Sequence, residues 1–337
     1  MSPNPTDKFN RPLHDLRISV IDRCNFRCTY CMPDDASKHY EFLEKTEWLS
    51  YDEIARLTKL FVQNGVSKVR LTGGEPLLRP NLHELVAKLR QIKGIEDLTL
   101  TTNGSLLAKH ARELKDAGLH RLTVSLDTLD SRTFRLMNGH RGSVDEVLAG
   151  ISEAKRAGFD DIKINVVVQK GVNDHSILDL VKYFKAKHTL RFIEYMDVGN
   201  CNHWESRYVV PSKQIVKTIH AIYPLEPLEA KYFGEVAECY RFTDGSGEVG
   251  FISSITQPFC GSCTRVRLST DGKIFTCLFA NNGTDLCASL RGGATDTQLN
   301  EIITRVWSNR VDRYSELRSS IPPQLHNSKV EMFQIGG

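Results

Sequence analysis

The chain has 337 residues, which is enough for one large domain or two smaller ones with a buried core. Its 44 lysine and arginine residues nearly balance 41 aspartate and glutamate residues, and the net charge of +3 argues against a protein that coats nucleic acid or a membrane surface. An anionic ligand must therefore be bound by cations placed locally.

The first fifteen residues are polar and rich in proline, without the apolar segment of a signal peptide. No stretch of the sequence approaches the roughly 18 apolar residues of a membrane span. The nine cysteines are an odd number, and most of them fall in two clusters, which favours thiolate ligation over a secreted disulfide framework. We therefore predict a cytoplasmic protein that binds neither membranes nor nucleic acid.

Apolar, β-rich segments recur along the chain, each followed by a polar loop and a helical pattern. They are Leu16–Ile21, Val66–Leu71, Asp97–Thr101, Arg121–Leu126, Asp161–Val168 and Thr189–Met196. Capping patterns predict that one helix begins after Ser50, with Glu53, and the next after Asn81, with Glu84. Consecutive βα units of this kind predict an α/β fold with a parallel sheet.

Three cysteines follow the first predicted strand in the segment CNFRCTYC, and they are Cys24, Cys28 and Cys31. Thiolates at C-x3-C-x2-C spacing on a short loop can bind three corners of a cubane [4Fe–4S] cluster, which leaves one iron without a protein ligand. An open iron allows chemistry as well as electron storage. A disulfide, or a zinc site completed by a distant ligand, remains an alternative for the same residues.

The spacing, with the aromatic Tyr30 before the last cysteine, resembles the signature of the radical S-adenosylmethionine (SAM) superfamily. This resemblance implies that the open iron binds the amino and carboxylate groups of SAM, and that an electron from the cluster cleaves SAM to a 5′-deoxyadenosyl radical. It also implies a partial six-stranded parallel (β/α)6 barrel rather than a flat sheet. Functional residues of barrels gather at the carboxyl ends of the strands, where this cysteine loop lies.

The second predicted strand ends in Gly73-Gly74-Glu75-Pro76. Glycine has no Cβ, so this backbone can approach a ligand closely, although the same residues could form a simple turn. In the radical SAM superfamily this motif binds the amino group of SAM. By resemblance, the SAM pocket is lined by Tyr30, Gly74, Ser125 and Met196.

A second cysteine set has the spacing C-x2-C-x13-C and consists of Cys260, Cys263 and Cys277. The intervening segment Leu268–Phe275 is predicted to form a hairpin that turns at Asp271-Gly272 and returns the third cysteine to the first two. Zinc remains an alternative, because C-x2-C is half of a zinc ribbon that Cys287 could complete. The cysteines outside both sets are predicted to be ordinary core residues: Cys201, Cys239 and Cys287.

Together, the two cysteine sets resemble those of the GTP 3′,8-cyclase family, which catalyses the first step of molybdenum cofactor biosynthesis. The resemblance runs from Arg17 to the terminal Gly336-Gly337. It implies a second [4Fe–4S] cluster whose free iron binds the guanine of GTP, and a Gly-Gly tail that reaches the active site. The implied reaction is hydrogen abstraction from C3′ of GTP and attack of the ribose radical on C8, which gives 3′,8-cyclo-7,8-dihydroguanosine 5′-triphosphate.

GTP carries about four negative charges, which charge-assisted hydrogen bonds must compensate. The resemblance assigns GTP contacts to Arg17, Arg70, Thr101, Lys163, Arg265, Val266 and Arg267. It assigns catalysis to Arg17, Arg265, Arg267 and the first three cysteines, Cys24, Cys28 and Cys31. Arg265 and Arg267 alternate in a strand pattern, so both side chains should lie on one face. The sequence has no Walker-type phosphate loop, which argues against ordinary GTPase chemistry.

We expect three parts: a radical SAM barrel over residues 10–225, a smaller C-terminal domain with the second iron–sulfur cluster over residues 226–320, and a tail over residues 321–337. The first boundary is placed where Pro224 and Pro227 interrupt the helical pattern that begins at Ser212. A closing helix is expected around Leu299–Asn309.

The resemblance also implies an electron donor such as flavodoxin or ferredoxin, a downstream cyclic pyranopterin monophosphate synthase, and a homodimer. Two other functions remain open. One is a radical SAM peptide-modifying enzyme with an auxiliary cluster, which would usually need more cysteines and has no evident use for Arg265 and Arg267. The other is a non-catalytic, zinc-binding interaction protein. About eight irons per chain would indicate two clusters, and zinc without iron would indicate the last alternative.

Overall fold

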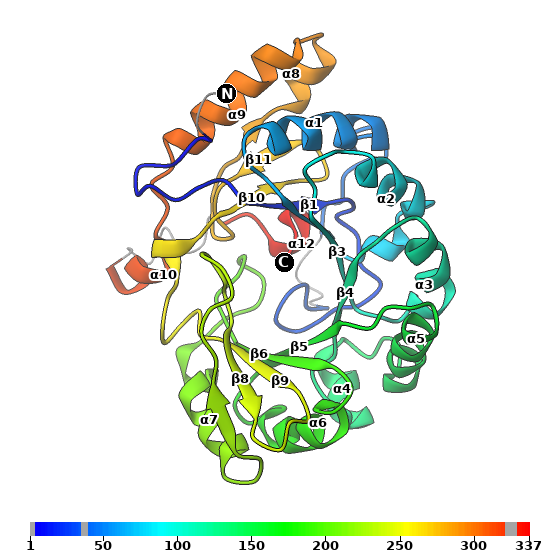
Figure 1. The fold of residues 1–337 in the computed structure, drawn as a ribbon, viewed down its shortest axis with the longest axis vertical. Helices are drawn as coiled ribbons and strands as arrows, with labels where there is room; N and C mark the ends of the chain where they lie inside the picture. Colours follow the sequence, from blue (N-terminus) through cyan, green and yellow to red (C-terminus); the bar gives the residue numbers. More distant parts are fainter. Residues whose placement is uncertain (1–3, 35–39, 321–328) are drawn as a thin grey trace.

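The computed structural model describes residues 4–34, 40–320 and 329–337 of the chain. Its strands form a twelve-stranded sheet in the order β12-β11-β10-β1-β2-β3-β4-β5-β6-β9-β8-β7. The sheet curls into a ring with most helices on its outer side (Figure 1). None of the helices in the described ranges is long and apolar enough to cross a membrane.

The predicted βα units form the centre of the sheet. Their strands are β1 (Asp15–Ser19), β2 (Lys68–Thr72), β3 (Asp97–Thr102), β4 (Arg121–Ser125), β5 (Ile162–Val168) and β6 (Thr189–Glu194). Each strand pairs in parallel with the next one along the chain. The helices between them are α1 (Tyr51–Gln63), α2 (Leu82–Arg90), α3 (Leu107–Asp116), α4 (Ser131–Met137), α5 (Val144–Arg156) and α6 (Ile177–Phe184). The predicted six-stranded parallel barrel is confirmed.

The C-terminal region extends this barrel at both edges. After α7 (Ser212–His220), the strands β7 (Leu225–Pro227), β8 (Glu238–Phe242) and β9 (Glu248–Ile252) join the edge at β6. The strands β10 (Arg265–Leu268), β11 (Lys273–Phe275) and β12 (Thr284–Asp285) join the opposite edge at β1. The helices α8 (Cys287–Arg291), α9 (Asp296–Ser308) and α10 (Tyr314–Leu317) follow. The C-terminal region therefore shares the sheet of the barrel, and the boundary at residue 225 stays a prediction.

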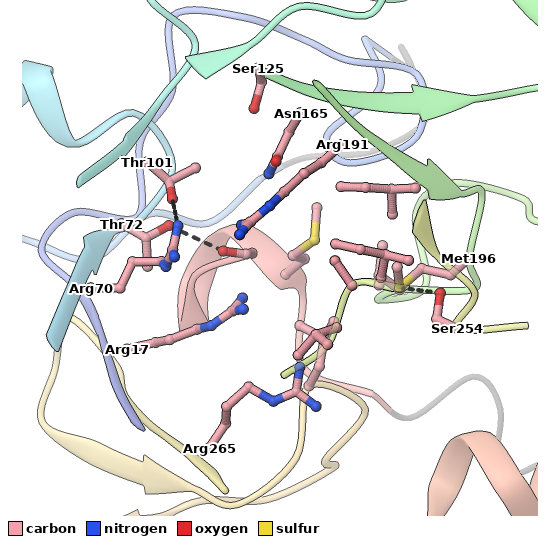
Figure 2. Close-up of a pocket in the computed structure, with 18 of the residues that line it drawn as sticks. Arg17, Arg70, Thr72, Thr101, Ser125, Asn165, Arg191, Met196, Ser254 and Arg265 are labelled. Carbon is pink, nitrogen blue, oxygen red and sulfur yellow. Dashed lines mark hydrogen bonds between the residues drawn. The ribbon is translucent and has the colours of Figure 1, made fainter. Parts of the chain in front are cut away.

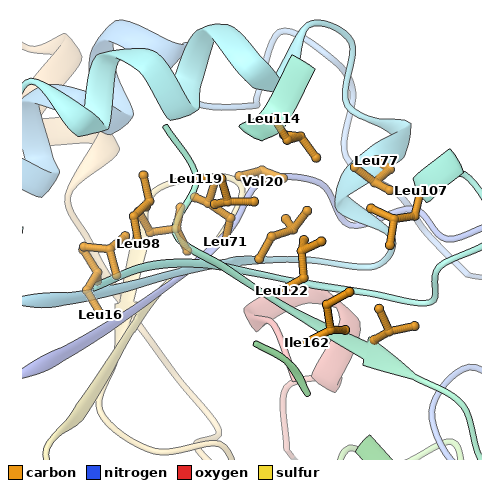
Figure 3. Close-up of a cluster of buried hydrophobic side chains, with 14 of the residues drawn as sticks. Leu16, Val20, Leu71, Leu77, Leu98, Leu107, Leu114, Leu119, Leu122 and Ile162 are labelled. Atoms are coloured by element: carbon orange, nitrogen blue, oxygen red, sulfur yellow. The ribbon is translucent and has the colours of Figure 1, made fainter. Parts of the chain in front are cut away.

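Side chains on the barrel strands alternate between the interior of the ring and the helical layer outside it. On β5, Ile162 and Ile164 are buried in the outer layer, whereas Lys163 and Asn165 face the interior. The outward residues form the hydrophobic core, and Figure 3 shows part of it: Leu16, Leu71, Leu98, Leu107, Leu114 and Leu122. The inward residues are largely polar or charged (Figure 2). The alternation of side chains along each strand therefore separates the hydrophobic core from the polar interior of the ring.

The two helix starts that the sequence predicted have different outcomes. Ser50 caps α1 and forms the complete capping box with Glu53. Helix α2 also begins directly after Asn81, as predicted, but the capping box is absent because the Asn81 side chain makes no capping hydrogen bond. Its backbone lies in the left-handed region, with φ 56°, a conformation that asparagine tolerates better than most residues. Asn81 therefore serves as a turn residue before the helix.

The end of the chain lies inside the ring. Residues 329–337 lead into the short helix α12 (Met332–Ile335), which contacts β1, and the C-terminus lies near the centre of the barrel in Figure 1. The first part of the predicted tail, residues 321–328, lies outside the described residues. The expectation that the terminal Gly-Gly reaches the barrel interior agrees with this placement.

Candidate functional site

The interior of the ring is a cavity of about 680 Å³. All six cysteines of the two predicted sets line it: Cys24, Cys28, Cys31, Cys260, Cys263 and Cys277. Each of these cysteines is half-buried and free of disulfides. Two cysteine sets that are more than 200 residues apart in the sequence therefore open into one space.

The first cysteine set lies on the loop after β1. A tight turn, in which the amide of Cys31 donates to the carbonyl of Cys28 at 2.9 Å, holds two of its members close together. Burial raises the pKa of Cys24 to about 11, with Glu75 as the next cause, and burial raises the pKa of Cys28 well above its ordinary value. On their own, these side chains favour the protonated thiol over the thiolate. A positively charged iron centre would stabilise the thiolate form, since metal binding deprotonates thiols.

The glycine motif after β2 packs against the backbone that precedes Cys24. A Cβ on Gly74 would lie 2.2 Å from the carbonyl oxygen of Arg23, and one on Gly73 would lie 2.3 Å from that of Ile21. The amide of Gly74 donates to Ile21 at 2.7 Å, and the amide of Glu75 donates to Arg23 at 2.9 Å. Glycine is thus required here for close contact between two backbones, whatever ligand the motif binds.

The predicted SAM residues gather at the end of the cavity that contains the first cysteine set. Tyr30, Gly74, Ser125 and Met196 all line the cavity. The Tyr30 hydroxyl donates to the buried Asp127 at 2.7 Å, and Ser254 donates to the Met196 sulfur at 3.7 Å. The Asn202 side chain bridges the carbonyls of Tyr30 and Met196, at 3.3 and 3.2 Å. The loops after β1 and β6 are therefore fixed to each other at this end.

Cations from six strands line the cavity. They are Arg17 of β1, Lys68 and Arg70 of β2, Arg121 of β4, which pairs with Asp97, Lys163 of β5, Arg191 of β6, and Arg265 and Arg267 of β10. Figure 2 shows that Arg17, Arg70, Arg191 and Arg265 point toward the same space. Arg70 is oriented by hydrogen bonds to the hydroxyls of Thr101 at 3.0 Å and Thr123 at 3.1 Å.

These cations repel one another. Burial and the neighbouring Arg267 and Arg70 hold the pKa of Arg17 well below its ordinary value. Burial, with Arg191 as the next cause, lowers the pKa of Lys163 to about 8. Within the described ranges, neither Arg17 nor Arg191 forms an ion pair with a carboxylate. Buried charges without partners are costly, so this arrangement favours a bound polyanion.

The second cysteine set lies beside the arginine pair on β10. The predicted hairpin is confirmed: β10 and β11 are antiparallel and turn at Asp271-Gly272. Arg265 donates to the Cys263 sulfur through Nε at 3.3 Å and Nη2 at 3.1 Å. Burial alone would raise the pKa of Cys263, but Arg265 and Arg310 lower it to about 6.

The three residues of β10 that the resemblance assigned to GTP do not all face the cavity. Arg265 and Arg267 line it, as the alternation predicted. The Val266 side chain is buried in the hydrophobic core on the other face of the strand. The Val266 side chain therefore points away from the cavity, so its contact with GTP, which stays a prediction, would have to be made by its backbone.

The tail fills the space next to Arg267. This arginine donates to the carbonyl oxygens of Ile335, at 3.3 Å, and Gly336. Gly336 has φ 75°, and a Cβ there would lie 2.2 Å from Thr72. Gly337 lines the cavity. Gly336 therefore packs against Thr72 of β2 in a conformation and a space that exclude larger residues, and Gly337 follows it into the cavity.

The cysteines outside the two sets differ from one another. Cys287 is buried in the core and does not line the cavity, as predicted. The same prediction was wrong for Cys239, which lines the cavity, and for Cys201, which is half-buried and donates to Glu331 at 3.2 Å. Cys239 lies on β8 and Cys201 lies in the loop after β6, and both sulfurs make polar contacts that strand alternation does not reveal.

Cys287→Ala should retain the full iron content. Its side chain packs in the core, with its Cβ near Gly272, so we expect a loss of about 1 kcal/mol in the free energy of unfolding and wild-type iron per chain. Iron analysis and thermal unfolding after anaerobic purification measure both quantities. Loss of half the iron would instead make Cys287 a cluster ligand.

A [4Fe–4S] cluster with one open iron takes three thiolates, one on each of its other irons. Each cysteine set supplies three thiols to one cavity wall. Both sets therefore fit a [4Fe–4S] cluster with one iron free.

Known proteins share both halves of this architecture. A family model described as the radical SAM superfamily matches residues 18–184, and one described as Molybdenum Cofactor Synthesis C matches residues 188–316. A GTP 3′,8-cyclase of Xanthomonas campestris pv. campestris is 53% identical over 332 residues, which cover 98% of this chain and 97% of the relative. The chain belongs to the GTP 3′,8-cyclase family.

Other members of the family are similar along their whole length. GTP 3′,8-cyclases of Acidothermus cellulolyticus and Staphylococcus aureus are 52% and 48% identical, and each alignment covers 98% of both chains. The crystal structure of Streptococcus suis SuiB covers 92% of this chain and 68% of its own, with 18% identity and a TM-score of 0.61. That likeness concerns the fold alone.

The family resemblance in the sequence did not identify every residue of the site. Arg191 lines the cavity beside Lys163, and its position on β6 follows the same inward alternation. That alternation is the sequence signal that could have identified Arg191 as a residue of the site. Arg11 and Arg310 donate to backbone carbonyls of the second cysteine set, and Asp7 pairs with both of them, but these residues come from opposite ends of the chain. Their contacts leave no local pattern in the sequence.

Proposed function

We propose that this protein converts GTP to (8S)-3′,8-cyclo-7,8-dihydroguanosine 5′-triphosphate, the first step of molybdenum cofactor biosynthesis. The observation that carries the proposal is a single cavity that combines two open three-cysteine sets with a ring of poorly compensated cations. A triphosphate suits such a ring, because guanidinium groups bind phosphate oxygens in bidentate fashion. The family of the chain supports the same reaction.

The site residues divide between the two ends of the cavity. We propose that Cys24, Cys28 and Cys31 hold the first cluster and that Tyr30, Gly74, Ser125 and Met196 bind SAM beside it. Cys260, Cys263 and Cys277 hold the second cluster, where guanine binds. When bound, the first cluster supplies the electron that cleaves SAM to methionine and a 5′-deoxyadenosyl radical. The chain itself contributes orientation and shielding from water.

The triphosphate is bound by the cations on the strands. The cations that serve this role are Arg17, Arg70, Lys163, Arg265 and Arg267, and Thr101 orients Arg70. Arg191 lines the same cavity, so we assign it the same role. Binding a polyanion removes the mutual repulsion that lowers the pKa of Arg17 and of Lys163. With the base held at one end and the phosphates at the wall, the ribose between them is fixed toward the first cluster.

The proposal also includes the location, the electron donor, the downstream enzyme and the oligomeric state of the protein. We propose a cytoplasmic location, reduction by a flavodoxin or ferredoxin, and transfer of the product to cyclic pyranopterin monophosphate synthase. The homodimer predicted from the family resemblance is part of the same proposal. A radical SAM enzyme that modifies peptides is the second candidate, but it would leave the cation ring without an evident ligand.

Anaerobic incubation with SAM, a reductant and GTP tests the reaction. We expect 5′-deoxyadenosine to form with GTP and to fall to background with ATP, together with a cyclised guanine product identified by mass spectrometry. Formation of 5′-deoxyadenosine with unchanged GTP, whatever the nucleotide present, would contradict the proposal and favour the peptide-modifying alternative.

A further inference from the structure

A loop near the start of the chain packs against the second cysteine set. Residues 7–11 form this loop, and Asp7 holds it closed by accepting hydrogen bonds from the amides of Phe9 at 2.9 Å and Arg11 at 3.0 Å. The side chains of Asp7 and Arg11 are both fully buried. Because buried charges are stable only with partners, the position of this loop depends on the contacts that its charged groups make.

Asp7 is shared by two buried guanidinium groups. Its Oδ2 accepts from Arg11 Nε at 2.5 Å and from Arg310 Nη1 at 3.3 Å, and Arg310 lies over the Trp307 ring at 4.7 Å. Arg310 Nε also lies 3.4 Å from Oδ2 of the half-buried Asp312, so two carboxylates face these two guanidinium groups. The charges balance in number, and the loop acts on its neighbours through the hydrogen bonds that the two guanidinium groups donate.

What lies beside it is the Cys260–Cys263 segment. Arg11 donates to the carbonyl of Cys260 at 2.6 Å, and Arg310 donates to the carbonyl of Cys263 at 2.7 Å. Arg310 Nη2 also donates to the Cys263 sulfur at 3.2 Å, while Arg265 reaches the same sulfur at 3.1 Å. Two guanidinium groups thus share one thiol that is assigned to a cluster.

The first cysteine set has different surroundings. Within the described part of the chain, no guanidinium donates to the sulfur of Cys24, Cys28 or Cys31. The Cys24 sulfur accepts from the amide of Phe26 at 3.3 Å, and the carboxylate of Glu75 lines the same end of the cavity. Hydrogen bonds to cluster sulfurs, together with the local charge, set reduction potentials. The two sets should therefore differ in potential.

We propose that Arg310, held in place by Asp7, is a positioning residue that raises the reduction potential of the second cluster through its hydrogen bond to the Cys263 sulfur. The inference rests on the proposed function, which assigns that cluster to the second cysteine set. A positive group that donates to the thiolate stabilises the reduced, more negative cluster. Arg265 acts on the same sulfur from the β10 side, but it also faces the substrate.

The test measures the potential of the second cluster alone. The full chain carries Cys24→Ala, Cys28→Ala and Cys31→Ala, so that about four irons per chain remain and only one cluster titrates. In this background, Arg310→Gln should shift the potential to a more negative value, and Arg310→Lys should shift it less. Arg241→Gln is the matched control, because it removes an equal charge from an exposed side chain on β8 that pairs with Glu226 of β7. Its potential should not move.

Asp7→Asn should shift the potential of the second cluster in the direction opposite to Arg310→Gln. A simple loss of structure would not produce such a shift. The substitution removes the shared negative charge, so the potential should become more positive. This variant decides the question if Arg310→Gln fails to retain iron. Full iron with an unshifted potential in Arg310→Gln, or a negative shift in Asp7→Asn, would overturn the inference. Absence of iron from the background protein itself would overturn the proposed function and this inference with it.

Discussion

Replacing any cysteine of the first set by serine, as in Cys24→Ser, is expected to reduce 5′-deoxyadenosine formation to the level of an enzyme-free control. These cysteines line the cavity together with Tyr30 and Met196, so on the proposed assignment a lost thiolate removes the cluster beside SAM. A Cys263→Ser variant should still cleave SAM slowly and lose GTP binding. Product analysis and equilibrium binding of GTP separate the two outcomes.

Cys287→Ala is the control for both sets, because its side chain lies in the core outside the cavity. It should behave as the wild type in both assays. If a Cys263→Ser protein that has lost its second cluster still bound and cyclised GTP normally, guanine ligation at that cluster would be wrong. If it lost SAM cleavage as completely as Cys24→Ser, the two sets would not have separate roles.

Arg265→Ala and Arg267→Ala are each expected to weaken GTP binding and to uncouple SAM cleavage from cyclisation. Loss of one charge-assisted contact costs about 1.5–3 kcal/mol, which is roughly a tenfold to hundredfold loss of affinity. Hydrogen abstraction also needs C3′ near the radical, and a loose triphosphate lets the ribose move away. The ratio of 5′-deoxyadenosine to cyclised product should therefore rise above its wild-type value.

The Arg265→Ala and Arg267→Ala variants should weaken binding and coupling for different structural reasons. Arg265 contacts the Cys263 sulfur, whereas Arg267 holds the carbonyls of Ile335 and Gly336. Arg267→Ala should therefore also release the tail, seen as faster amide exchange in residues 332–337. Arg241→Ala is the control, since Arg241 is exposed on β8 and pairs with Glu226. A wild-type product ratio and wild-type affinity in both variants would mean that these arginines do not bind substrate.

The barrel could be predicted because its signals are local. Alternating strands, glycine turns and the capping box at Ser50 each depend on a few neighbouring residues. The same alternation placed Arg265 and Arg267 on one face of β10. By the same rule Val266 lies on the opposite face, in the core, although the family pattern grouped it with the two arginines.

The remaining features depend on contacts between distant parts of the chain. The pairing of β9 with β6 and of β10 with β1 makes the C-terminal region part of the barrel sheet, and no sequence pattern specifies that pairing. The contact of Arg11 with Cys260 spans 249 residues. The glycines at 73 and 74 were predicted from their freedom to approach a ligand, whereas the structure shows them against the backbone of Ile21 and Arg23.

Turnover with GTP that carries deuterium at C3′ tests the central claim most directly, namely that the cavity holds the ribose of GTP beside the SAM pocket. The C3′–D bond breaks and a C–D bond forms at the 5′-carbon of the deoxyadenosyl group. The account predicts one deuterium in each 5′-deoxyadenosine produced with cyclised nucleotide, under anaerobic conditions with excess reductant. Unlabelled 5′-deoxyadenosine, together with a nucleotide that keeps its deuterium, would contradict it.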